Sequence, residues 1–218
     1  MLLLDGLLPR PDLIALRDAA QDLSFGDGRA TAGRHAATVK ANDQASSGPA
    51  LDAITAVVER ALAAHPVFRS AARPKALTKL IVSRYQKGQT YGLHVDDALM
   101  QGLRTDLSFT LFLSDPDTYD GGALIIEDHF EARAIKPDAG ALFLYPATTL
   151  HRVEPVTRGQ RLAVVGWVQS LIRDAGQRDI LFDLDQAVDH CFATEGKTAQ
   201  FDRLSKTRSN LLRMWAEP

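Results

Sequence analysis

Six short runs of β-favouring residues fill the middle of this 218-residue chain. Turn signals such as Lys87-Gly88, Asp120-Gly121-Gly122 and Arg158-Gly159 separate the runs, and no helical periodicity lies between them. Many short strands at regular spacing are typical of a β-sandwich or barrel, whereas a parallel α/β sheet needs helices between its strands. The six predicted strands are 77–85, 107–113, 123–126, 132–135, 141–145 and 162–168.

Helical patterns flank this β region on both sides. Pro11 can start one helix, a second fits residues 51–65, and Pro66 ends it. After Arg173 an apolar helical pattern returns, and a last helix fits residues 198–215. We therefore expect a mainly β fold with flanking helices. The expected parts are N-terminal helices with a lid segment (1–74), a β core (75–173) and a C-terminal helical extension packed outside it (174–218).

The composition excludes several classes of protein. A 45% hydrophobic fraction and a 24% charged fraction are ordinary for a globular chain, so overall disorder is excluded. The net charge of -2 gives no sign of a nucleic-acid partner. The single cysteine, Cys191, excludes an intrachain disulfide and a CxxC metal site. No apolar run approaches the length of a membrane helix, and Asp5 interrupts the apolar N-terminus. We expect a soluble cytoplasmic protein with no membrane partner, and a homo-oligomer stays open.

Residues 25–49 form an irregular insert between the two N-terminal helical patterns. The insert is rich in Gly, Ala, Ser and Thr, with a possible short strand at 37–40. A long segment without periodicity is usually functional or mobile. We interpret it either as a lid over a site or as a flexible surface loop. As a lid, it would offer four side chains for contacts: Arg29, Arg34, Lys40 and Asn42.

The triplet His94-Val95-Asp96 places an imidazole and a carboxylate on the same face of an extended strand. His151 follows 55 residues after Asp96, beyond a predicted strand and its Pro146 turn. Two imidazoles and one carboxylate on one face of a metal form the facial triad of non-haem Fe(II) oxygen chemistry. Each part alone is weak evidence, because a lone His in a β core is usually a hydrogen-bonded core residue. The remaining histidines have no comparable partner and are interpreted as structural: His35, His65, His129 and His190.

Arg161 lies ten residues after His151, at the head of the apolar predicted strand 162–168. An arginine at the head of so buried a strand needs an anionic partner, because an unpaired buried charge is very costly. Its planar guanidinium suits two-pronged capture of a carboxylate. The partner is either a carboxylate ligand or one of the chain's own Asp residues.

Taken together, these motifs resemble the Fe(II)/2-oxoglutarate dioxygenases of the prolyl 4-hydroxylase type. The resemblance rests on the sequence Tyr85-Gln-Lys-Gly88-Gln-Thr-Tyr91-Gly-Leu-His94-Val-Asp96, followed by His151 and Arg161. The closer match is to the bacterial PKHD-type hydroxylases, often named iron-uptake factors. The resemblance covers nearly the whole chain and includes segments 27–33, 39–42 and 120–124 and the helical tail.

The resemblance implies a double-stranded β-helix (jelly-roll) core and hydroxylation of an unactivated C–H bond. His94, Asp96 and His151 would bind Fe(2+), and Arg161 would pair with the distal carboxylate of 2-oxoglutarate. Tyr85 would donate a hydrogen bond to the same carboxylate. Tyr91 would face the co-substrate or substrate, or else be an ordinary packed aromatic. L-ascorbate would act as the reductant. The family name favours a small-molecule substrate linked to iron acquisition, with peptidyl proline as the alternative.

Two other classes of function stay open at this point. A cupin-like protein could use the same jelly roll and a zinc or nickel ion as a binding or sensing module. Such a module has no need of Arg161 and would form no succinate. The β core could also be a non-catalytic scaffold in which His and Asp residues merely pair with each other.

Overall fold

Two antiparallel β-sheets face each other in the computed structural model, which describes residues 1–127 and 130–217. The larger sheet has eight strands in the order β1-β14-β10-β17-β6-β4-β2, with β5 pairing with β17 as well. Its strands are β1 (Leu2–Leu4), β14 (Leu142–Pro146), β10 (Leu107–Phe112), β17 (Arg161–Ser170), β6 (Ile81–Tyr85), β4 (Asp43–Ala45), β2 (Phe25–Asp27) and β5 (Pro74–Leu77).

The smaller sheet has five strands in the order β13-β12-β15-β7-β3. These strands are β13 (Ala132–Ile135), β12 (Leu124–Glu127), β15 (His151–Val153), β7 (Thr90–His94) and β3 (Lys40–Ala41). Two further pairs cap the ends: β11 (Asp120–Gly121) with β16 (Val156–Arg158), and β8 (Leu99–Met100) with β9 (Leu103–Arg104). Two facing antiparallel sheets of this kind form a jelly roll, so the predicted fold class is confirmed.

Strand β10 explains how the core is divided. All six of its residues are buried, because both faces of the strand are covered. Leu107, Phe109 and Leu111 belong to the apolar cluster beneath the helices. The alternate residues Ser108, Thr110 and Phe112 face the space between the sheets, as the period of two requires. The inner face of the large sheet therefore carries hydroxyl groups, whereas its outer face is wholly apolar at this strand.

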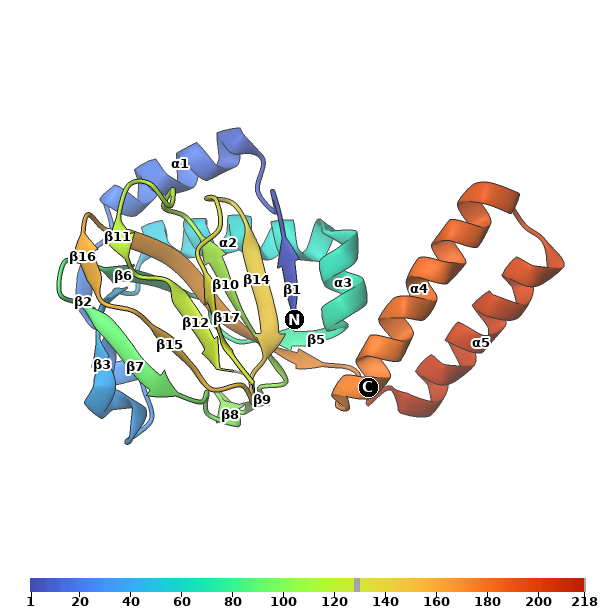
Figure 1. The fold of residues 1–218 in the computed structure, drawn as a ribbon. Coiled ribbons are helices and arrows are strands. Elements are labelled where there is room, and N and C mark those ends of the chain that lie inside the picture. Colours follow the sequence, from blue (N-terminus) through green and yellow to red (C-terminus); the bar gives the residue numbers. More distant parts are fainter. Residues whose placement is uncertain (128–129, 218) are drawn as a thin grey trace.

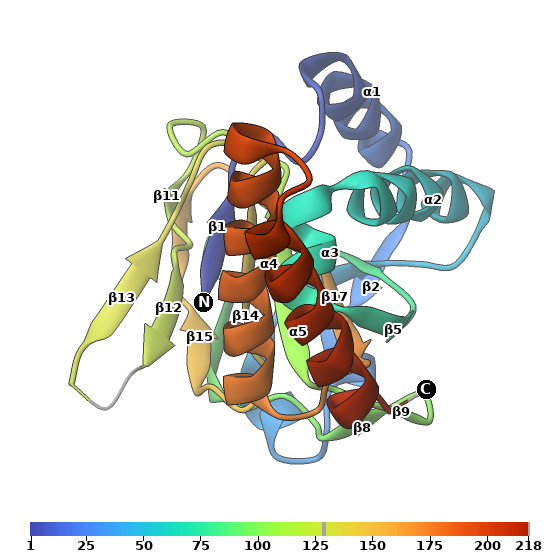
Figure 2. The same ribbon diagram turned by 90° about the vertical axis from the view of Figure 1, so that its right-hand side faces the viewer.

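Helices cover the large sheet and extend beyond it (Figures 1 and 2). They are α1 (Arg10–Gln21), α2 (Pro49–Ala64), α3 (Pro66–Ala72), α4 (Ala175–Glu195) and α5 (Ala199–Trp215), with 3-10 turns η1 (Gly28–Thr31) and η2 (Ala36–Val39). In both views α4 and α5 lie side by side as a hairpin outside the β core, as expected. Asp185 of α4 holds this hairpin to α3 through an ion pair with Arg73, 2.6 Å long.

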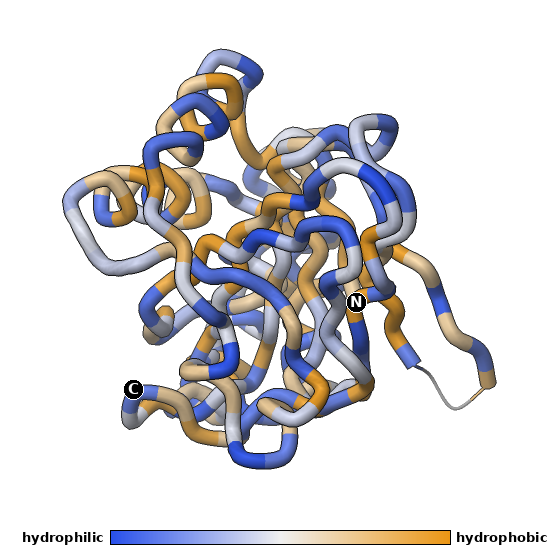
Figure 3. The backbone as a smooth tube through the Cα atoms, turned by 90° about the vertical axis from the view of Figure 1, so that its left-hand side faces the viewer, coloured by the Kyte–Doolittle hydropathy of each residue, from blue (hydrophilic) through white to orange (hydrophobic). Residues whose placement is uncertain are grey.

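Hydrophobic and hydrophilic residues alternate at short intervals along the chain, as Figure 3 shows. Short alternation is the pattern of strands and amphipathic helices that bury one face. Within the described residues, no helix is both long and apolar enough to cross a membrane.

Three sequence predictions need correction or refinement, and one strand was not predicted. The single strand predicted at 77–85 is two strands, β5 and β6, separated by residues 78–80. The predicted strand at 37–40 is wrong for most of its length: residues 36–39 form the 3-10 turn η2, and the strand begins at Lys40. Pro66 ends α2 but also begins α3, since proline is well tolerated in the first turn of a helix. The apolar residues 2–4 pair with β14 as the edge strand β1. The interpretation of His129 as structural lies outside the described residues.

Candidate active site

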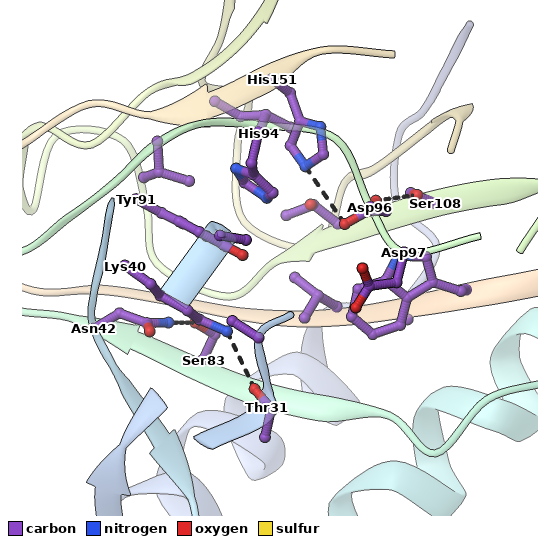
Figure 4. Close-up of a pocket in the computed structure, with 18 of the residues that line it drawn as sticks. Thr31, Lys40, Asn42, Ser83, Tyr91, His94, Asp96, Asp97, Ser108 and His151 are labelled. Atoms are coloured by element: carbon purple, nitrogen blue, oxygen red, sulfur yellow. Dashed lines mark hydrogen bonds and ion pairs between the residues drawn. The ribbon is translucent and has the colours of Figure 1, made fainter. Parts of the chain in front are cut away.

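The register of the small sheet brings His94 and His151 together. These residues are direct partners in the antiparallel pair β7–β15, although they are far apart in the sequence. Asp96 follows two residues after the end of β7 and points into the space between the sheets (Figure 4). Ligand atoms of the three side chains lie within 4.8 Å of one another, and His151 Nε2 is 3.9 Å from Asp96 Oδ1.

Hydrogen bonds fix which atoms of this triad face one another. His94 Nδ1 lies 2.8 Å from the Gly92 carbonyl oxygen, and His151 Nδ1 lies 2.9 Å from that of Thr149. A carbonyl only accepts, so each Nδ1 carries the proton and each Nε2 keeps its lone pair. Ser108 donates to Asp96 Oδ2 at 2.5 Å, which leaves Oδ1 toward His151. The arrangement suits a divalent metal ion bound by two nitrogens and one oxygen.

Burial keeps the His94 imidazole neutral. Desolvation, and secondarily the neighbouring His151, lowers the pKa of His94 to about 4. The ring centroids of the two histidines are 4.2 Å apart, so two imidazolium charges here would repel strongly. A neutral imidazole is the form that binds metal, so the lowered pKa of His94 prepares it for that role at neutral pH.

Arg161 lies at the start of β17, directly opposite Tyr85 of β6 in the sheet register. The residue is only 2% exposed, yet no carboxylate of the described chain forms an ion pair with it. Its Nε has no hydrogen-bond partner. The guanidinium carbon lies 5.3 Å from the Tyr85 ring centroid and 5.2 Å from that of Phe112. An internal pairing with an Asp, the alternative left open by the sequence, is therefore not what the structure contains.

The two tyrosines of the sequence motif occupy different places. Tyr85 is buried beside Arg161; desolvation raises the pKa of its hydroxyl, and the positive charge of Arg161 opposes that rise. Tyr91 stacks on His94 with ring centroids 3.6 Å apart. The ammonium group of Lys40 lies over the Tyr91 ring, 4.9 Å from the ring centroid. Both tyrosines line the same cavity as the His–Asp–His triad.

This cavity has a volume of about 750 Å³, counting the part that opens to solvent. Residues 25–49 form one wall of it, held by β3 against β7 and by β4 against β6. Of the four contacts predicted for this segment, Lys40 and Asn42 line the cavity. Arg29 and Arg34 do not line it, and both are exposed. Burial lowers the pKa of Lys40 to about 8, against the attraction of the Asp96 and Asp27 carboxylates.

Sequence reasoning missed the role of Ser108. A usable signal was present: Ser108 and Thr110 are polar residues at alternate positions in an otherwise apolar strand. Such a pattern indicates a second buried face with polar partners. The histidines at 35, 65 and 190 lie outside the cavity lining, and His65 Nδ1 instead accepts a hydrogen bond from the Phe68 amide at the start of α3.

Comparison with known proteins defines the class. Residues 80–169, which contain the triad and Arg161, match the 2OG-Fe(II) oxygenase superfamily. A prolyl-4-hydroxylase crystal structure from Pseudomonas putida shares the fold with a TM-score of 0.54, at 21% identity over 78% of this chain and 91% of that one. The chain is thus a 2OG-Fe(II) oxygenase by fold and by sequence.

The particular family follows from the whole chain. Residues 175–217 match the PKHD-type hydroxylase C-terminal domain. A PKHD-type hydroxylase of Maricaulis maris is 51% identical over 214 residues, 98% of both chains. Another from Synechococcus elongatus is 50% identical over 219 residues, again 98% of both. This chain belongs to the PKHD-type hydroxylase family.

Membership in this family makes the protein an Fe(II)- and 2-oxoglutarate-dependent dioxygenase that hydroxylates a small-molecule or peptide substrate. The predicted enzyme class is confirmed. Family membership excludes both alternatives, the cupin-like binding module and the non-catalytic scaffold. The structure adds a cavity in which a metal-compatible triad and an unpaired arginine lie together.

Proposed function

We propose that His94, Asp96 and His151 bind the Fe(II) of this dioxygenase. The observation that carries the proposal is the pattern of hydrogen bonds around the three side chains. Each imidazole has its Nδ1 engaged by a backbone carbonyl, and Asp96 has one oxygen engaged by Ser108. One ligand atom per residue is thereby left for a shared ion: Nε2 of each imidazole and Oδ1 of Asp96. A facial set of three protein ligands leaves the other coordination positions for the co-substrate and oxygen.

We further propose that Arg161 binds the distal carboxylate of 2-oxoglutarate. Its buried guanidinium has no acidic partner in the described chain, so an anionic ligand would compensate a charge that the fold leaves unpaired. Tyr85, adjacent in the register, would donate a hydrogen bond to the same carboxylate. Tyr91 would hold His94 by stacking and face the substrate side.

Bound Fe(II) and 2-oxoglutarate supply the oxidation that hydroxylates a C–H bond, with succinate and CO₂ as co-products. The protein's own residues position the two reactants and exclude water. Phe143 and Tyr145 of β14 stack on each other in the apolar cluster between the sheets, and Tyr145 packs edge-on against His151 with ring centroids 5.2 Å apart.

The substrate is proposed to be a small molecule, with peptidyl proline as the alternative. Residues 25–49 are proposed as the wall that selects it, since Lys40 and Asn42 reach the cavity from there. L-ascorbate is the proposed reductant, by family resemblance. A cytoplasmic location is proposed as well, because the only cysteine, Cys191, is buried and unpaired. Residues 75–173 are proposed as the catalytic unit, supported by 1–74 and 174–218.

Two sets of variants test the assignments. Asp96→Ala should abolish anaerobic Fe(II) binding and succinate formation, because a facial triad has no spare ligand. Arg161→Ala should raise the 2-oxoglutarate requirement about 100-fold or more while iron still binds, and Arg161→Lys should recover only part of the affinity. Full iron affinity in Asp96→Ala, or unchanged 2-oxoglutarate binding in both Arg161 variants, would contradict the corresponding assignment.

A further inference from the structure

Lys40 is a buried cation placed on the wall of the proposed active site. It is the first residue of β3 and the direct register partner of Tyr91 in β7, which fixes its side chain against the tyrosine ring. The residue is only 7% exposed. Figure 4 shows Tyr91 between Lys40 and His94, and Lys40 lines the same cavity as the triad.

The ammonium group has too few partners for a buried charge. Its Nζ donates one hydrogen bond, 3.1 Å long, to the neutral hydroxyl of Thr31. The Tyr91 ring face gives a second, weaker contact. No carboxylate of the described chain forms an ion pair with Lys40. An ammonium has three donors, so two remain for a ligand in the cavity.

Lys136 is a second lysine whose ammonium group lies over a tyrosine ring, and it can be compared with Lys40. Its Nζ also lies over a tyrosine ring, 4.1 Å from the centroid of Tyr119, and donates to the Tyr119 carbonyl at 2.8 Å. Lys136 does not line the cavity. It therefore combines a tyrosine-ring contact and one hydrogen bond, as Lys40 does, without access to the proposed site, and serves as a control.

The charges of the cavity do not balance without a further anion. The proposed function places Fe(II) beside Asp96, which uses the carboxylate that most attracts Lys40. It also assigns the distal carboxylate of 2-oxoglutarate to Arg161 and leaves the other end of this co-substrate to the metal. With Lys40 and Arg161 positive, Asp96 negative, a divalent metal and a dianionic co-substrate, one positive charge remains. Asp97 at the rim is exposed, so water screens its charge.

We propose, resting on that function, that Lys40 is a specificity-determining residue whose ammonium binds a carboxylate of the substrate to be hydroxylated. A single remaining positive charge with two free donors matches a monovalent carboxylate better than a phosphate dianion. The carboxylate would lie against Lys40, in the same cavity as the triad.

The test uses Lys40→Met, which removes the charge but keeps the chain length, and Lys40→Arg, which keeps the charge. Lys136→Met is the control. The probes are free amino acids and short proline-containing peptides, each paired with its C-terminal amide. Binding to the anaerobic Fe(II)–2-oxoglutarate protein is measured by calorimetry, and stimulated succinate release gives KM and kcat. Binding of 2-oxoglutarate is measured separately for every variant.

We expect at least one acid to bind wild type about 10- to 100-fold more tightly than its amide, as a charge-assisted hydrogen bond provides. That ratio should fall to about one in Lys40→Met through KM, and should persist in Lys40→Arg and Lys136→Met. A panel with no preference for acids, or a preference that survives in Lys40→Met, overturns the proposal. Loss of 2-oxoglutarate binding in Lys40→Met would assign the carboxylate to the co-substrate and also overturn it. Failure of wild type to form succinate with Fe(II) would instead refute the proposed function, a separate result.

Discussion

Replacing Lys40 by Met should make the metal-free protein more stable. Burial lowers the pKa of Lys40 from 10.5 to about 8, so the folded state disfavours the charged form. At about 1.4 kcal/mol per pKa unit, that shift corresponds to about 3 kcal/mol of destabilisation at neutral pH. Methionine keeps the apolar stem but loses the Thr31 hydrogen bond and the ring contact, which together offset about 1 kcal/mol. The expected net gain is about 2 kcal/mol at pH 7.

The gain has a defined dependence on pH. Between the folded pKa of about 8 and the unfolded value of 10.5, the unfolded chain binds the extra proton. The free energy of unfolding of wild type therefore rises with pH across this window, relative to a variant without the amine. The advantage of Lys40→Met should be complete below pH 8 and should shrink toward zero, or reverse slightly, by pH 10.5.

Urea unfolding in the presence of a chelator measures this difference directly. For a chain of 218 residues, about 2 kcal/mol also corresponds to a rise in Tm of about 4–8 °C. Lys136→Met controls for replacing a ring-stacked lysine by methionine elsewhere in the fold. A Lys40→Met protein that is no more stable than wild type at pH 7 would refute the reasoning. A difference that stays constant from pH 7 to 10.5 would refute it equally.

Three further predictions concern other parts of the structure. Ser108→Ala should weaken Fe(II) binding about 10-fold by calorimetry, because Asp96 loses the hydrogen bond that orients it; unchanged affinity would argue against that role. Gly166→Ala should destabilise the protein by about 1–3 kcal/mol in urea, since a Cβ there would lie 2.5 Å from a core leucine methyl. Asp185→Ala should cost about 1–3 kcal/mol by removing the carboxylate partner of the partly buried Arg73, measured by urea unfolding with Asp189→Ala as the control.

The fold could be predicted from the sequence wherever local chemistry and tertiary packing agree. The strand predicted at 132–135 matches β13, and Thr198 caps α5 at the expected boundary. The prediction for 37–40 was wrong because Ala and Thr are compatible with either a 3-10 turn or a strand. In this region the choice is made by pairing: only Lys40 and Ala41 reach the edge of β7.

The candidate site was predictable in its residue types but not in its register. A histidine 55 residues after an Asp gives no indication that it will lie opposite His94. That contact depends on β15 pairing with β7 on one side and with β12 on the other. The burial of Lys40 has the same origin, because a two-residue strand in an irregular segment gives no periodic signal. Family resemblance supplied the grouping that periodicity could not.

The cationic side chains inside this protein differ in whether the fold itself supplies their partners. The partly buried Arg73 is paired with Asp185, and the buried Arg178 donates to the carbonyls of residues 172 and 173 at 2.8 and 2.7 Å. The fold can thus satisfy a buried arginine from its own groups where the role is to join elements. Arg161 and Lys40 are buried to a similar degree, yet neither has an acidic partner in the described chain, and both line one cavity. Because an uncompensated charge costs stability, its retention at two positions in one cavity is best explained by anions that arrive with the reactants.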